Sequence, residues 1–281
     1  MKKKLGTVLV IFITIGCIFL GFNTRKVNAI NVTQISTINQ ESQSYMVETN
    51  KHNIIMIDGG TAEDSEHLEK TLLEKGGVVD SWFITNAYLE NFGAMREILK
   101  NGKIQINNIY TSFNSSDWYE ENEPEVYPEI LDFLDLLYSE NIVTKVKDVP
   151  LKHEILLDNL YISVLNVKNP EFTGQYAGYN QSMIIKVNNT YKSMIFMGNI
   201  AQDGADKFKD NNLDEIDCDA VALSINGAEN VSNEIYSKMS PEYIFMPKKD
   251  VNNYAQNLAQ ELKVQNVVVN TNDEDVTINI W

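Results

Sequence analysis

Carboxylate and amide side chains follow several apolar segments of this chain, where strands of a sheet would end. Asp58 comes directly after the run Ile54–Ile57, and Glu90 lies shortly after a second apolar run at 81–84. Asn86 and Asn91 flank Glu90, and Ser224 follows a third run. Such oxygen-bearing side chains can move protons, bind a hard cation or hydrogen-bond to one another. Glu90 is the acid–base candidate among them.

The elements that would position this pocket alternate between short apolar strands and helical patterns. We expect strands at 30–37, 44–49 and 81–84, and helices at 63–75, 93–100 and 128–140. A hairpin is expected from 180–187 and 193–199, and a closing hairpin within 267–280. This alternation over 281 residues with 43% hydrophobic content is typical of one layered α/β domain.

The order of these segments resembles the metallo-β-lactamase fold family, in the branch similar to the hydrolase domain of bacterial competence (DNA-uptake) proteins. The family has a strand ending in I-D-x-G-G and a second strand running into T-H-x-H-x-D-H-x-G-G. Here Ile57-Asp58-Gly59-Gly60 resembles the first, and Thr85 and Gly93 match the Thr and first Gly of the second. The resemblance implies an αββα four-layer sandwich over residues 30–281.

The resemblance also places the family's metal ligands, and none of the six positions holds a histidine. The bridging aspartate's position follows Gly198, and the last histidine's position follows Ile225. The residues at the six positions are Asn86, Tyr88, Glu90, Asn91, Asn199 and Asn226. The resemblance implies that they share one polar pocket, which Asp58 and Ser224 also line.

The chemistry of zinc argues against a metal at these positions. Zinc sites use imidazole, thiolate and carboxylate donors, whereas neutral amides cannot offset a dication's charge. The three histidines, His52, His67 and His153, are scattered and are expected at the surface. Cys218 is expected to be a small buried apolar residue. We therefore expect no metal and no cofactor. Calcium or manganese on the oxygen-rich set is the alternative, and a network of amides that bond one another is the simplest reading.

The N-terminal segment has the pattern of an export signal. Lys2, Lys3 and Lys4 precede an apolar run at 5–22, and Val27-Asn28-Ala29 offers small residues at a cleavage position. We expect residues 1–29 to be a signal peptide or a membrane anchor, and the protein to be extracellular or attached to the cell surface. The apolar run is long enough for either outcome.

Charge constrains the partners. Residues 1–29 hold 5 of the 23 basic residues and no acidic one, so residues 30–281 carry 18 basic against 39 acidic side chains, a formal charge of −21. Such a surface repels phosphate backbones, so we expect no nucleic-acid binding. The partner is expected to be a small ligand or an extracellular protein.

Two aromatic segments are candidate binding loops. The first, 113–127, surrounds Trp118 and Tyr119 with acidic residues, and the second, 169–180, carries Phe172, Tyr176 and Tyr179 among glycines. Exposed tyrosines make amphipathic contact surfaces, although tyrosines that clamp a loop to the sandwich would give the same pattern.

These observations predict a binding or regulatory protein with a hydrolase fold and no catalysis. The first alternative is a metal-dependent hydrolase with an altered oxygen-rich site. The second is an extracellular interaction module that uses its acidic aromatic loops. No nucleophile elbow, phosphate loop or dinucleotide fingerprint occurs in the sequence.

Overall fold

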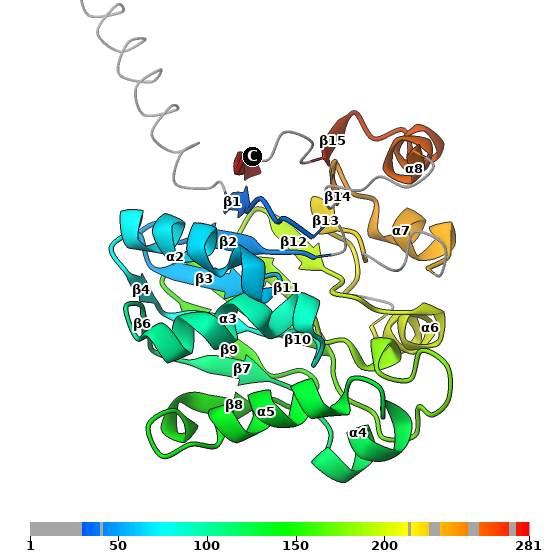
Figure 1. Cartoon of the computed structure of the whole chain (residues 1–281). Helices are drawn as coiled ribbons and strands as arrows, with labels where there is room; N and C mark the ends of the chain where they lie inside the picture. Colours follow the sequence, from blue (N-terminus) through cyan, green and yellow to red (C-terminus); the bar gives the residue numbers. More distant parts are fainter. Residues whose placement is uncertain are drawn as a thin grey trace, which may run out of the picture.

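Two seven-stranded sheets pack face to face, with helices on both outer surfaces (Figure 1). This arrangement comes from a computed structural model, which describes residues 30–39, 42–212, 215–224, 231–246, 253–269 and 274–280. Three apolar clusters separate the four layers: helices against the first sheet, sheet against sheet, and the second sheet against its helices. The αββα sandwich expected from the sequence is confirmed.

The first sheet contains the chain's opening strands and its last one. Its order is β16-β1-β2-β3-β5-β7-β8, and β3, β5, β7 and β8 run parallel to one another. Its strands are β1 (Ile30–Gln34), β2 (Tyr45–Glu48), β3 (Ile54–Ile57), β5 (Ser81–Phe83), β7 (Ile109–Thr111), β8 (Val146–Asp148) and β16 (Val276–Ile280).

The second sheet is formed by the later part of the chain. Its order is β15-β14-β13-β12-β11-β10-β9, antiparallel from β9 to β12 and parallel from β12 to β15. Its strands are β9 (Glu154–Leu157), β10 (Leu160–Asn166), β11 (Ile184–Asn188), β12 (Ser193–Phe196), β13 (Ala220–Ala222), β14 (Tyr243–Met246) and β15 (Asn266–Val269).

Helices from the two halves of the chain cover opposite faces of the sandwich (Figure 1). Those over the first sheet are α2 (Ser65–Glu74), α3 (Leu89–Asn101), α4 (Ser116–Asn122) and α5 (Tyr127–Leu137). Those over the second are α6 (Gln202–Asn211), α7 (Asn233–Met239) and α8 (Tyr254–Leu262). Short pieces complete the set: η1 (Ala62–Asp64), η2 (Val143–Lys145), η3 (Tyr179–Gln181) and the pair β4 (Val78–Val79) and β6 (Gln105–Ile106).

Strand β3 shows why its sequence is apolar throughout. Successive side chains of a strand point to opposite faces. Ile54 and Met56 pack under helices α2 and α3, whereas Ile55 and Ile57 pack between the sheets. A strand buried on both faces has no position left for a polar side chain, so its first polar residue, Asp58, marks its end.

Gly93 in helix α3 permits a close backbone contact. A Cβ atom at this position would come within 2.6 Å of Ala62 N and 2.8 Å of the Thr61 carbonyl carbon. A side chain of any size would therefore push helix α3 away from η1. The helix carries Glu90 and Asn91, so this glycine determines how close these two residues lie to the sheet.

One sequence expectation about these elements was wrong. The segment 267–280 is not a hairpin, because β15 pairs with β14 in the second sheet while β16 pairs with β1 in the first. In helix α2 the buried face holds Leu68 and Leu72, whereas Leu73 is 47% exposed. No helix within the described ranges is long and apolar enough to span a membrane.

Candidate functional site

Asp58 lies at the carboxyl end of β3, where the backbone turns sharply. Its φ of 54° is in the left-handed region, which is uncommon for a residue other than glycine. Two hydrogen bonds fix this turn: the Asp58 amide donates to Phe83 O at 2.8 Å, and Trp82 Nε1 donates to Asp58 O at 3.0 Å. The turn therefore aims the carboxylate along the sheet toward the end of β5.

Three donors converge on the Asp58 carboxylate. Thr85 donates from its backbone amide to Oδ1 and from its hydroxyl to Oδ2, each at 2.7 Å, and Asn91 Nδ2 donates to Oδ2 at 2.9 Å. The side chain is 1% exposed, and burial raises the pKa of Asp58 to about 7 against the opposing effect of these donors. The nearby Glu90 charge raises this pKa further.

Asn91 and Asn199 form a reciprocal amide pair beside this carboxylate. Asn91 Nδ2 donates to Asn199 Oδ1 at 3.2 Å, and Asn199 Nδ2 donates back to Asn91 Oδ1 at 3.1 Å. Asn199 Nδ2 also lies 3.5 Å from Glu90 Oε1. The pair joins helix α3 to the turn after β12. Of the six predicted positions, Glu90, Asn91 and Asn199 are therefore brought together with Asp58.

Asn86 and Tyr88 contact the second aromatic segment instead of this network. Asn86 Nδ2 donates to Gly178 O at 3.0 Å and to Ser182 Oγ at 2.7 Å, and the Tyr88 ring stacks on Tyr179 with centroids 4.5 Å apart. A Cβ atom on Gly178 would lie 2.0 Å from the Tyr88 hydroxyl. Both side chains hold down the second aromatic segment, which Glu123 Oε1 also fastens by accepting from Gly178 N at 2.8 Å.

Two predicted site residues remain, Ser224 and Asn226, and the structure describes the first of them. Ser224 is fully buried, and its hydroxyl donates to Ile200 O at 2.8 Å, so its oxygen is tied to the backbone. Asn226 lies outside the described residues. Cys218 is buried in the third apolar cluster as predicted, and burial raises the pKa of its thiol to about 12.

Two possibilities were open for the first aromatic segment, an exposed binding loop and aromatic rings that clamp the segment to the sandwich, and the buried rings of Trp118 and Tyr119 support the second. Ser115 caps helix α4 by accepting from Trp118 N, and Trp118 and Tyr119 are 9% and 4% exposed in the cluster beneath the helices. Trp118 Nε1 donates to Pro170 O at 3.2 Å. The acidic neighbours of these two rings suggest an exposed loop, whereas the segment is a helix with one apolar side. In the second segment Tyr176 is 45% exposed and Phe172 receives Lys207 over its ring.

Several residues of this region carried no recognisable signal in the sequence. Gln34 and Tyr45 face each other across β1 and β2, and Gln34 Nε2 reaches across to Met246 O in the second sheet. Burial raises the pKa of the Tyr45 hydroxyl, and the charge of Asp58 adds to this effect. Only the sheet register, not any motif, brings Tyr45 next to Asp58.

The donors present do not fit a zinc or iron site. Asp58 already receives three hydrogen bonds, and the amide oxygens of Asn91 and Asn199 each accept from the other residue. Among the described residues no three His, Cys, Asp or Glu side chains gather closely enough to hold a metal. His52 and His67 are exposed surface residues, paired with Glu48 and Asp275 respectively.

Comparisons of the fold with solved structures give a consistent answer. The chain is similar to YhfI from Bacillus subtilis, titled a metallo-β-lactamase fold protein, with a TM-score of 0.56 and 11% identity over 89% of this chain and 100% of that one. It is also similar to Igni18 from Ignicoccus hospitalis, titled a metallo hydrolase, with a TM-score of 0.51 and 14% identity over 88% and 98% of the two chains. The protein has the metallo-β-lactamase fold.

A third metallo-β-lactamase-fold neighbour shows how widely this fold is used. CmlA from Streptomyces venezuelae, titled a diiron β-hydroxylase, matches with a TM-score of 0.55 and 9% identity over 89% of this chain but only 54% of its own length. No protein-family model matches the sequence, and no curated protein matches it. At these identities the likeness establishes the fold, and function must be argued from the site.

The raised pKa of Asp58 predicts a characteristic pH dependence of stability. The folded state keeps its proton up to about pH 7, whereas an unfolded aspartate loses it near its ordinary value of 3.8. The free energy of unfolding should therefore fall by roughly 2–3 kcal/mol between pH 5 and pH 8. Urea denaturation of the Asp58→Asn variant, in which Thr85 can reverse its hydroxyl, should show a flatter profile. Parallel profiles for the two proteins would contradict this assignment.

The contact between Tyr88 and Gly178 predicts a double-mutant result. Gly178→Ala should lower the free energy of unfolding by about 2–4 kcal/mol, because the new methyl group collides with the Tyr88 hydroxyl. Tyr88→Phe in the same chain should recover part of this loss. Tyr88→Phe alone is the control, because it removes the hydroxyl without adding the methyl group. Strictly additive losses at 178 and 88 would show that the two residues do not interact.

Proposed function

We propose that this protein is an exported, non-catalytic binding or regulatory member of the metallo-β-lactamase fold group, with a degenerate metal site. Within that group we place it in the branch similar to the hydrolase domain of competence proteins, as the sequence landmarks suggest. The observation that carries this proposal is the reciprocal amide pair of Asn91 and Asn199 next to Asp58.

The amide pair supports the proposal because its hydrogen bonds occupy the oxygen atoms that a metal would need as ligands. A metal ligand must offer a free lone pair to the cation, and negatively charged ligands must offset the positive charge of the cation. Here the amide oxygens accept from the protein, and the Asp58 carboxylate is met by Thr85 and Asn91. The residues form a closed polar network that stabilises the join between the two sheets.

The alternatives receive less support from the same contacts. An oxygen-rich cation site would have to displace the Thr85 and Asn91 donors from Asp58 before the carboxylate could act. An interaction module built on Trp118 and Tyr119 would have to unpack buried rings, although Tyr176 remains accessible. We therefore favour the binding protein over both.

Metal content tests the proposal directly. The full chain, purified without chelator and dialysed in turn against zinc, manganese and calcium, is expected to retain no stoichiometric metal by elemental analysis. The positive control restores family ligands through Asn86→His, Tyr88→His, Glu90→Asp, Asn91→His and Asn199→Asp. Uptake of zinc by the restored variant alone would support the proposal, while stoichiometric zinc or manganese in the native protein would overturn it.

Export is the part of the proposal that depends on residues 1–29. The lysines, the apolar run and the small residues before Ile30 support it. Fractionation of the producing cells should place the protein in the medium or the membrane fraction, and mass analysis of its N-terminus distinguishes a cleaved signal from a retained anchor. Recovery of the protein with residues 1–29 intact in the cytoplasm would contradict export.

A further inference from the structure

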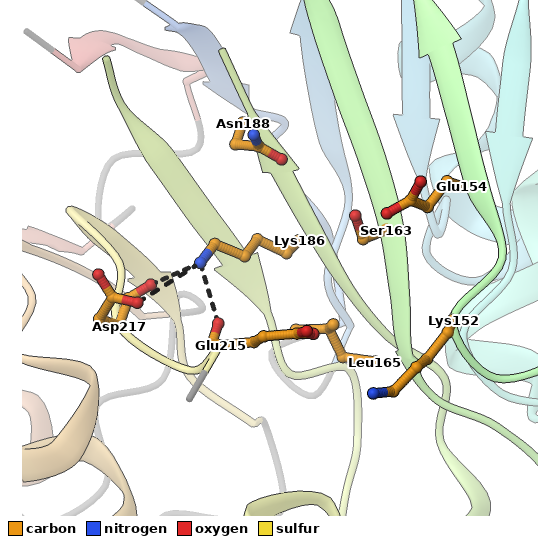
Figure 2. Close-up of a pocket in the computed structure, with 8 residues that line it drawn as sticks. All are labelled: Lys152, Glu154, Ser163, Leu165, Lys186, Asn188, Glu215 and Asp217. Carbon is orange, nitrogen blue, oxygen red and sulfur yellow. Dashed lines mark hydrogen bonds and ion pairs between the residues drawn. The ribbon is translucent and has the colours of Figure 1, made fainter. Parts of the chain in front are cut away.

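A polar groove of about 280 Å³ lies on the outer face of the second sheet, away from Asp58. Helices α6, α7 and α8 pack over the other end of this sheet, so the outer side chains of β9, β10 and β11 line the floor of the groove (Figure 2). Register places Ser163 opposite Glu154 on one side and Lys186 on the other. The groove is at the small end of ligand pockets, which span roughly 300–1,000 Å³.

Lys186 is a fixed cation at one side of the groove. Its Nζ donates to the backbone oxygens of Glu215 at 2.9 Å and Asp217 at 2.7 Å, and its side chain is 17% exposed. An ammonium group has three donors. The closest carboxylate oxygen, Asp217 Oδ1, is 3.9 Å away, so one N–H and most of the charge remain for a ligand.

Lys152 rises from the other side of the groove at a fixed point (Figure 2). Its backbone is left-handed, with φ of 63°, and its amide donates to Val164 O at 2.8 Å. In the part of the chain that the structure describes, four lining side chains make no hydrogen bond or ion pair. These are Lys152, Glu154, Ser163 and Asn188.

The charges of the groove select the type of ligand. Two ammonium groups and the carboxylates of Glu154, Glu215 and Asp217 line it, so charges of both signs are present with one more negative than positive. An anion would be repelled by a domain of formal charge −21, and a cation would meet the fixed Lys186 ammonium. A ligand with both charges avoids both penalties, while Ser163 and Asn188 offer neutral hydrogen bonds.

We propose that this groove binds a small zwitterion with an ammonium and a carboxylate group, which is the chemistry of a free amino acid. The carboxylate lies toward Lys152 and Lys186, and the ammonium lies toward Glu154. This site is separate from the amide network, so its function does not depend on whether a metal binds near Asp58.

Thermal shift and calorimetry with the full chain test this assignment. Each of the common free amino acids is titrated to about 10 mM, because an open groove suits a Kd near 1 mM. At least one is expected to bind saturably, while its N-acetyl derivative, which lacks the ammonium, and its amide, which lacks the carboxylate, bind at least about tenfold more weakly. Equal binding of either derivative, or no binding by any amino acid, would overturn the zwitterion site.

Variants locate the binding. Lys152→Gln and Glu154→Gln should each weaken the amino acid's Kd by about tenfold, because each removes one charged contact without touching the core. Lys70→Gln, at an exposed lysine of helix α2, is the matched control and should leave the Kd unchanged. Binding that survives both groove variants would assign the ligand to another surface and refute the proposal.

Discussion

The buried Asp58 carboxylate constrains the rest of this structure. A carboxylate at 1% exposure is tolerated only where donors meet it, and here they come from the end of β5 and from helix α3. Asn91 then continues the network to Asn199 on the second sheet. One buried carboxyl group therefore links three elements of the first half to the second sheet. The left-handed turn at Asp58, the close approach at Gly93 and the crowding of Gly198 against Thr85 are the backbone conditions for this link.

Most of the fold could be predicted because local patterns decide it. Strand 54–57 is apolar throughout, strand 184–187 is apolar except at Lys186, and helices such as α2 and α5 show apolar residues at helical spacing. The closing strands could not be paired from the sequence. Nothing local to β15 and β16 indicates that one joins β14 and the other joins β1, because that choice depends on edges formed far away in the chain. Likewise, the acidic residues around Trp118 suggest an exposed segment, whereas the segment is a helix whose aromatic face is buried.

The sequence predicted which residues form the candidate site better than it predicted the contacts between them. Asp58, Glu90, Asn91 and Asn199 were identified as a group, and they do meet. The separate role of Asn86 and Tyr88 could not be foreseen, because it depends on Gly178 and Glu123, which are distant in sequence and belong to no motif. Amides can serve both ends of such a network, since each carries donors and acceptors. This versatility allows asparagines five residues apart, at 86 and 91, to stabilise different loops.

The pairing of β1 with β16 has a consequence for how the chain becomes a protein. Ile30 lies opposite Ile280, so the first strand of the domain finds its outer neighbour only when nearly the whole sequence is available. Contacts so distant in sequence slow folding, because a large loop must close before they form. Until then β1 lacks one of its two neighbours and the first sheet has an open edge. A chain that passes through a membrane before it folds benefits from such a delay, which suits the export proposed for this protein.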